Sequence, residues 1–332
     1  HMRVIWVKDG NIGHEKQVKV LLDQLSETTD ISIIEKTNRH SFLNKINNLI
    51  NYITFGISSM FLSQAQLSND HLYIKHNADI IIGAGNGAHY EIIRLKRLLS
   101  RHSKKQIKAI TILSPTYLKN KFDIICAPLH DKHKHSNDLN NVIYFEGSLS
   151  TVSTNEPDIN TILVAVGGIN KHYHFEEDHL ISQISYFVSL NTTKNCFIFN
   201  TRRTPTSMNS KLKLLSDKFD NIIFCDFKET DLSFEDILHK SSSKLISRDS
   251  VNMIYESLSC IGDTYLLDMK SKSEKNKIVK NVNSLIINRK VGYIDCGDLV
   301  EGLAKMKLYK QNKYNEVMAE VEKVAYALNK EI

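Results

Sequence analysis

Cysteines are few in this chain of 332 residues, and the sequence does not pair them. The five are scattered, at Cys126, Cys196, Cys225, Cys260 and Cys296. They form neither a C-x-x-C pair nor the even-numbered framework of a disulfide-stapled secreted domain. The pattern suits a reducing compartment, so we expect the protein in the cytoplasm.

Long apolar runs are also lacking. No stretch reaches the roughly 20 uncharged apolar residues that a transmembrane helix needs. The nearest candidate, Phe42 to Leu67, holds one lysine among many apolar and aromatic side chains. A core-packing helix pair or hairpin explains this segment. The alternative is a segment that lies on an anionic membrane surface, which would place the protein peripherally on the inner face of the cytoplasmic membrane.

Several catalytic signatures are missing as well. There is no D-x-D pair to hold a nucleotide-bridging metal and no G-x-S-x-G nucleophile motif. The run Gly83-Ala84-Gly85-Asn86-Gly87 places its third glycine too early for G-x-G-x-x-G, which argues against a nicotinamide cofactor. In the cluster His130 to His135 the alternating lysines would repel a cation. We therefore predict no cofactor and no metal.

What is present indicates a soluble globular protein with an acidic partner. Apolar residues make up 42% and charged residues 24% of the chain, and the formal net charge is +6. Such a balance favours nucleic acid, an anionic membrane or a phosphorylated substrate. The loops described below point to a phosphorylated substrate, and we expect no nucleic-acid partner.

Short β-branched runs alternate with helical periods along the whole chain. The runs are 3–7, 31–35, 79–85, 107–113, 122–128 and 141–145 in the first half, and 161–168, 196–201, 221–227, 243–249 and 264–269 in the second. The polar segment 148–160 separates the halves. The alternation predicts an α/β fold of two Rossmann-like domains, 1–150 and 151–309, with a C-terminal helix in 310–332 that returns to the first domain. Ligands should bind in an interdomain cleft at the carboxyl ends of the strands.

The loop after the first strand carries the candidate catalytic residues. Gly10 and Gly13 permit a tight turn whose free N–H groups can meet an anion. Asp9 and His14 flank it, and either can take a proton from an attacking hydroxyl. In the alternative, Asp9 only caps the following helix and His14 is its first turn. The glycine-rich loop with Gly85 and Asn86 is the second acceptor-side candidate, or simply a tight strand-to-helix turn.

In the second half, two strand ends carry candidate donor-binding residues. Gly167 and Gly168 end one strand, and their N–H groups with the Lys171 charge can hold a diphosphate. Arg202 and Arg203 follow the next strand and suit bidentate phosphate recognition. The alternatives are an ordinary glycine-bearing turn and solvated surface charges.

A third donor candidate is the segment Ser247 to Ser257. Helical spacing places Asp249, Asn252 and Glu256 on one polar face, and Met253 belongs to the same segment. Ser247 and Ser250 then cap the helix or bind phosphate, while Glu256 meets a ribose diol. A plain amphipathic helix is the alternative.

Five motifs in this order resemble the mitochondrial-fission (elongated mitochondria) family: DGNIGHEKQ, FDIICAPLHD, VAVGGINKHYHF, NTRRTPT and SRDSVNMIYES. That family is similar to GT-B glycosyltransferases such as the lipid-linked N-acetylglucosaminyltransferase of peptidoglycan synthesis. The resemblance implies a GT-B arrangement, an acceptor-side glycine loop with a histidine at Gly13-His14, and a donor-side serine/glutamate segment at Ser247 to Glu256. It also implies a sugar nucleotide held largely by the second domain.

The leading hypothesis is a metal-independent, inverting glycosyltransferase with a nucleotide-sugar donor and a cell-envelope glycan or lipid-linked acceptor. Asp9 or His14 is the general base, and Glu256 orients the ribose. Lys171, Arg202 and Arg203 neutralise the leaving phosphate. The alternatives are a sugar-nucleotide epimerase of the same fold and a non-enzymatic scaffold at membranes.

Overall fold

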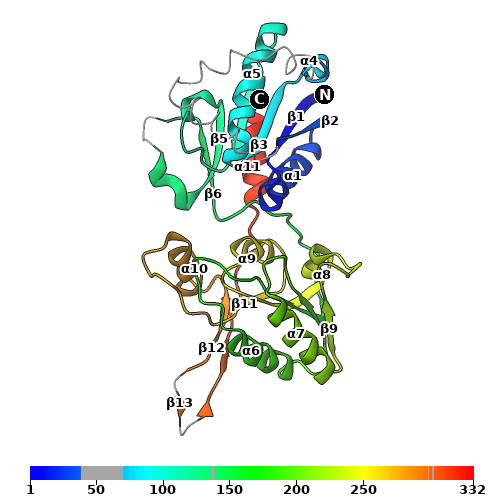
Figure 1. Ribbon diagram of the computed structural model, residues 1–332, viewed down its shortest axis with the longest axis vertical. Coiled ribbons are helices and arrows are strands. Elements are labelled where there is room, and N and C mark those ends of the chain that lie inside the picture. Colours follow the sequence, from blue (N-terminus) through cyan, green and yellow to red (C-terminus); the bar gives the residue numbers. More distant parts are fainter. Residues whose placement is uncertain (39–69, 136–138, 298, 301–302) are drawn as a thin grey trace. The chain divides into compact units, whose positions relative to one another are not determined.

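The computed structural model describes residues 1–38, 70–135, 139–297, 299–300 and 303–332. The whole apolar segment Phe42 to Leu67, and with it the membrane alternative, lies outside the described residues. The chain forms two compact units: His1–Ser150 together with Ala319–Ile332, and Thr151–Met318. Each unit is a mostly parallel sheet covered by helices (Figure 1).

The first unit contains a parallel sheet in the order β2-β1-β3-β4-β5-β6. Its strands are β1 (Met2–Lys8), β2 (Ile31–Thr37), β3 (Ile80–Ala84), β4 (Lys108–Ile112), β5 (Ile124–Pro128) and β6 (Val142–Phe145). The β3 residues Ile80, Ile81 and Ile82 are all at most 1% exposed. Burial on both faces is what a parallel strand between two helical layers requires, and it explains why these runs are continuously apolar.

Helices from both ends of the chain cover this sheet. They are α1 (Ile12–Ser26), α4 (His71–His76), α5 (Asn86–His102) and α11 (Glu320–Glu331), with 3-10 turns η2 (Lys119–Lys121) and η3 (Leu129–Lys134). Helix α1 buries Val18, Leu21, Leu22 and Leu25, the face that its apolar spacing predicts. The red C-terminal helix α11 packs against the blue α1 and against β6 (Figure 1).

The second unit contains a sheet in the order β15-β12-β11-β10-β7-β8-β9, in which β15 alone pairs antiparallel among the strands described. The strands are β7 (Asp158–Ala165), β8 (Asn195–Phe199), β9 (Ile222–Cys225), β10 (Ser241–Ile246), β11 (Asp263–Leu266), β12 (Gly292–Asp295) and β15 (Lys307–Tyr309). A small ribbon, β13 (Leu299–Val300) with β14 (Leu303–Ala304), lies between β12 and β15 in the chain.

The helices of the second unit are α6 (Glu177–Ser189), α7 (Thr206–Lys218), α8 (Phe234–Lys240), α9 (Val251–Leu258) and α10 (Lys277–Ile287). The central strand β7 feeds a core on each side of the sheet. Ile162 and Val164 belong to one apolar cluster, while Leu163 and Ala165 belong to the other. Successive side chains of a strand point to opposite faces, so a continuously apolar strand is needed to fill both cores.

The predicted α/β class and all eleven predicted strands are confirmed, with boundaries shifted by a few residues. The prediction missed β12 and β15. It was wrong to begin the last helix at Lys310, because α11 begins at Glu320. Residues 310–318 are instead held to the second unit by hydrogen bonds. Gln311 Oε1 accepts from Thr264 N, and Asn312 N donates to Arg289 O.

Strand order reverses once in each sheet, and this decides which loops meet. In the first unit the reversal falls between β1 and β3, and in the second between β7 and β10. Ligands of open α/β sheets bind where the order reverses, outside the carboxyl ends of the strands. The loops to examine are therefore those after β1 and β3, and those after β7 and β10.

Helix α11 should contribute strongly to the stability of the first unit. Leu328 is fully buried, whereas Tyr326 on the same helix is 67% exposed. Leu328→Ala leaves a cavity, and we expect it to lower the free energy of unfolding by about 2–5 kcal/mol in urea denaturation. Tyr326→Ala is the matched control and should change it by less than about 0.5 kcal/mol. Equal effects would show that α11 does not complete this core.

Candidate functional site

In the first unit a buried carboxylate holds a partly exposed histidine at the point where strand order reverses. Asp9 follows β1, and its Oδ2 lies 2.7 Å from Nδ1 of His14 in the first turn of α1. The Asp9 side chain is 1% exposed and that of His14 is 30% exposed. Asn11 caps α1 by accepting from His14 N, so the alternative in which Asp9 caps the helix is wrong.

The geometry assigns different roles to the two side chains. Asp9 Oδ1 accepts from Asn11 N at 2.9 Å, so both of its oxygens are engaged and the carboxylate is fixed. Because His14 Nδ1 faces this carboxylate, Nε2 is the nitrogen that remains for a substrate. A carboxylate that orients an imidazole in this way is the arrangement of a general base with its orienting partner.

The loop after β3 lies directly against this pair and has no room for a side chain. A Cβ at Gly85 would lie 2.3 Å from His14 Nδ1 and 2.8 Å from Asp9 Oδ2. Gly85 also has φ +83°, a conformation that favours glycine. Helix α5 begins immediately after it at Asn86, and Asn86 Oδ1 accepts from Thr116 Oγ1. Gly13, the remaining candidate here, lies in the first turn of α1.

His89 is a residue of this region that the sequence did not single out. It is buried in the first turn of α5, and its Nε2 lies 2.8 Å from Thr111 Oγ1. Burial, and next the charge of His14, lower the pKa of His89 to about 3. The His89 ring is therefore neutral beneath the Asp9–His14 pair at physiological pH. The sequence alone did not indicate that this histidine is buried.

In the second unit the loops after β7 and β10 are hydrogen-bonded to each other. Gly167 N donates to Ser247 Oγ at 2.8 Å, and Gly168 N donates to Asp249 Oδ2 at 3.0 Å. These two N–H groups thus have partners within the protein, and the expectation that they hold a diphosphate stays a prediction. Gly168 is required for another reason: a Cβ there would lie 1.9 Å from the carbonyl oxygen of Arg203.

The loop after β8 joins this cluster through Arg203. Its Nη2 lies 3.3 Å from Asp249 Oδ2 and donates to Ser250 Oγ. The Asp249 side chain is fully buried, while that of Arg203 is 47% exposed. Asp249 Oδ1 is buried, and no hydrogen-bond donor among the described residues reaches it. The cluster therefore presents one half-exposed cation and one buried acceptor.

Positive charge gathers at the carboxyl ends of β7 and β8. Lys171 and Arg202 are exposed. Lys171 follows Gly168 closely in the chain, and Arg202 directly precedes Arg203. Burial lowers the pKa of His172, and the charges of Lys171 and Arg203 lower it further. The cationic charges of Lys171 and Arg203, as distinct from burial, also favour an anion in this region.

Helix α9 follows the loop, but its residues are arranged differently from the prediction. Ser250 occupies the N-cap position without a side-chain cap bond, because its Oγ donates to Asp249; Ser247 Oγ is taken by Gly167 N. Neither serine caps the helix through its side chain. Asp249 precedes the helix, Asn252 is exposed, Met253 is half-buried and Glu256 is buried, so no single polar face forms.

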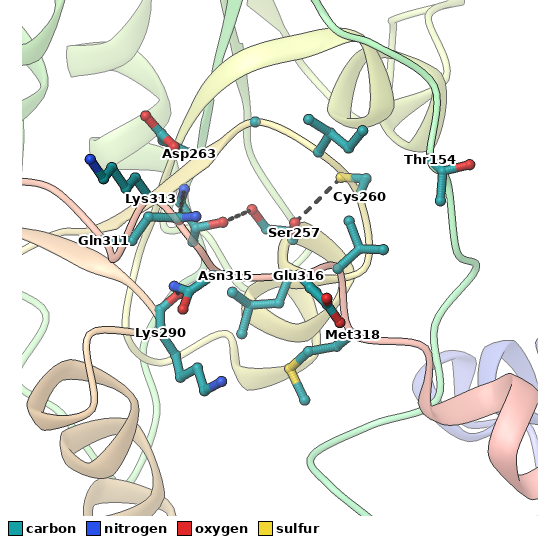
Figure 2. Close-up of a pocket in the computed structure, with 15 residues that line it drawn as sticks. Thr154, Ser257, Cys260, Asp263, Lys290, Gln311, Lys313, Asn315, Glu316 and Met318 are labelled. Atoms are coloured by element: carbon teal, nitrogen blue, oxygen red, sulfur yellow. Dashed lines mark hydrogen bonds between the residues drawn. The ribbon is translucent and has the colours of Figure 1, made fainter.

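The other end of α9 borders a pocket of about 450 Å³ at the amino-terminal end of β11, away from the candidate loops. Figure 2 shows Gln311, Lys313 and Asn315 on the side opposite Cys260. Two segments are hydrogen-bonded to the carbonyl oxygens at this end of the helix: Ser153 N donates to Ser259 O, and Met318 N to Leu258 O, both at 2.9 Å. They are the segments by which the chain enters and leaves the second unit.

A family model described as Mitochondrial fission ELM1 matches residues 12–332. The chain belongs to this family. No curated protein matches the sequence at a significant level. In the part of the chain that the structure describes, no helix combines the length and the apolar composition needed to cross a membrane.

Solved structures share the fold of this family member at low sequence identity. A putative UDP-N-acetylglucosamine 2-epimerase from Listeria monocytogenes has a TM-score of 0.52 at 10% identity, over 85% of this chain and 82% of that one. The UDP-GlcNAc 2-epimerase of Methanocaldococcus jannaschii has a TM-score of 0.50 at 10% identity, over 99% and 100%. MurG of Acinetobacter baumannii has a TM-score of 0.46 at 11% identity, over 87% and 84%. The fold is that of these epimerases, with two Rossmann-like units.

Gly85→Ala should displace the His14 imidazole. Alanine is strained in this backbone conformation (φ +83°, ψ 160°), at a cost of about 1–3 kcal/mol, and its methyl group in addition collides with His14. Gly10→Ala is the matched control, because Gly10 has φ +84° but nothing within 4 Å of its Cβ position. We expect a larger loss of unfolding free energy and a shifted His14 ring signal in NMR spectra for Gly85→Ala only. Equal losses with an unchanged ring signal would contradict the packing described.

His89 should make the protein less stable in acid. Its pKa is about 3 in the folded state against an ordinary 6.5, so the unfolded state binds more protons between these values. The free energy of unfolding should fall by about 2 kcal/mol from pH 7 to pH 5 through this group alone. His89→Gln should reduce that fall in urea denaturation, whereas the exposed-site control His102→Gln should not. An unchanged pH dependence in His89→Gln would show that His89 is not the group responsible.

Proposed function

We propose that the protein is a glycosyltransferase that uses a nucleotide-sugar donor. The observation that carries the proposal is the Asp9–His14 pair, in which a buried carboxylate lies 2.7 Å from a partly exposed imidazole where the strand order reverses. His14 is the general base, and Asp9 orients it and stabilises its protonated form. The sequence left the base open between these two residues.

The second unit binds the donor in this proposal. Lys171, Arg202 and Arg203 offset the negative charge of the donor phosphates, and the first turn of α9 adds backbone N–H groups. Asp249 Oδ1 is buried, and no hydrogen-bond donor among the described residues reaches it. In the proposal it accepts a hydrogen bond from a hydroxyl group of the nucleotide sugar. Binding of the ribose by Glu256, which is buried in α9, stays a prediction from the sequence.

The proposed reaction is a direct displacement. The acceptor hydroxyl loses its proton to His14 Nε2 and its oxygen forms a bond to the anomeric carbon of the sugar. The bond from that carbon to the phosphate oxygen breaks, and the electron pair leaves with the nucleotide. A single displacement inverts the anomeric centre. The cationic side chains stabilise the developing phosphate charge without a bridging metal. We propose a cell-envelope glycan or its lipid-linked precursor as acceptor.

The family and the shared fold support this choice of donor. Two of the structural relatives reported above, with TM-scores of 0.52 and 0.50, are named as a putative UDP-N-acetylglucosamine 2-epimerase and a UDP-GlcNAc 2-epimerase. A UDP-sugar is therefore the first donor to test. A thermal-shift screen against UDP-, GDP-, ADP- and CMP-sugars should show stabilisation by one nucleotide class, because a ligand that binds only the folded state raises the melting temperature.

Variants in the two units should have separable effects. His14→Ala should retain donor binding but reduce turnover by about 10²–10⁴-fold, because it removes only proton transfer. Arg202→Ala should weaken donor binding, measured by calorimetry. Lys213→Ala, which removes an exposed cation of α7, is its matched control. Arg203→Ala is a poorer test, because it also leaves the buried Asp249 carboxylate without its ion pair. Full turnover in His14→Ala would refute the assignment of the base.

The same fold supports a sugar-nucleotide epimerase as the second candidate, since the two structural relatives above carry that name. Incubation with the donor alone separates the two reactions: an epimerase converts the donor sugar, whereas a transferase needs the acceptor. A membrane scaffold stays a prediction from Phe42 to Leu67, which lies entirely outside the described residues. Loss of membrane binding on deletion of that segment would support it.

A further inference from the structure

Three side chains that suit a metal ion meet in the second unit, apart from the residues used above. They are His179 in the first turn of α6, Asp268 two residues after β11, and Cys296 directly after β12. One ligand atom from each lies within 4.8 Å of the others, and all three residues are partly buried. Among the described residues, no other group of this kind is present.

The fold brings these residues together by hydrogen bonds that do not depend on an ion. Strands β11 and β12 pair in parallel, so their carboxyl ends are neighbours. Gln183 lies one turn after His179 on α6 and is fully buried. Its Oε1 accepts from Asp268 N at 2.6 Å, and its Nε2 donates to Asp268 O at 2.9 Å. The backbone of Asp268 is thus clamped to the helix face that carries His179.

We propose that His179, Asp268 and Cys296 bind a Zn²⁺ ion. Imidazole, carboxylate and thiolate are the ligands that zinc takes in proteins, and three protein ligands leave a fourth position for water. In a tetrahedral site with ordinary zinc bond lengths, ligand atoms are about 3.3–3.8 Å apart, so small side-chain rotations close this cluster around the ion.

The neighbours of the cluster indicate what the ion does. The side chain of Asp268 also lies near Arg248, whose Nη2 is 3.8 Å from Asp268 Oδ1. Arg248 Nε also donates to Leu267 O, and the next residue in the chain is Asp249 of the donor-binding loop. The zinc ion therefore stabilises the ends of β11 and β12 against α6 and fixes the segment that leads into this loop. This role does not rest on the proposed function.

Sequence spacing could not reveal this site, because the ligands come from three distant segments and form no metal-binding motif. This proposal therefore replaces the prediction that the protein binds no metal. A hydrogen bond between Cys296 and Asp268 accounts for two of the residues without an ion. The experiment must accordingly test whether all three act together.

Cobalt(II) is the probe of choice, because a cobalt–thiolate bond gives a charge-transfer band in the near ultraviolet. The full chain, stripped with a chelator and dialysed, is titrated with Co²⁺ and then with Zn²⁺. We expect a thiolate band that Zn²⁺ abolishes, and a higher melting temperature with Zn²⁺. The other four cysteines are buried, so the band reports on Cys296.

Variants decide whether the cluster binds the ion. Cys296→Ser should remove the band, and His179→Ala should weaken cobalt affinity at least about tenfold. His174→Ala, which removes an exposed histidine from the same unit, is the matched control and should change neither. Circular dichroism verifies folding of each variant. A wild-type protein without a thiolate band, or unchanged affinity in a folded His179→Ala, overturns the proposal.

Discussion

The reversal of strand order in each sheet is the constraint on which both candidate site regions depend. Chain connections run in opposite directions on the two sides of each reversal, between β1 and β3 and between β7 and β10, and ligands of open α/β sheets bind outside the carboxyl ends of the strands at such points. Loops far apart in the sequence meet there. The Asp9–His14 pair touches Gly85 for this reason, and Gly168 touches Arg203 and Asp249 near the corresponding position of the second sheet.

Each unit uses a buried aspartate to fix a basic side chain at this position. Asp9 holds His14, and Asp249 holds Arg203, in both cases with the acid buried and the base partly exposed. A carboxylate shielded from water interacts more strongly with its partner than an exposed one does. The basic group is therefore held in one orientation while its outer side faces solvent. The two positions differ in charge type: a titratable imidazole in one and a permanent cation in the other.

The sequence predicted the fold well because each parallel strand is a run of β-branched residues that periodicity can identify, such as Ile80 to Ile82. It also brought Asp9 and His14 together, since they are only five residues apart. It could not predict that Gly85 packs against them, nor that Asp249 takes the N–H group of Gly168, because these contacts depend on sheet order. The last helix was extended too far because nothing in the sequence marks the hydrogen bonds that hold 310–318 to the second unit.

Helix α9 connects the loop at Asp249 with the two segments by which the chain enters and leaves the second unit. Eight residues span about 12 Å and form two turns, too short to bend appreciably. Its first turn adjoins Asp249, while its last carbonyl groups bond to the segments that enter and leave the unit, and buried Lys244 donates to Ser257 O beside them. A short, straight helix that is hydrogen-bonded at its end moves as a unit. Any ligand that shifts α9 must move both connecting segments with it, and by reciprocity tension on those segments changes affinity for that ligand.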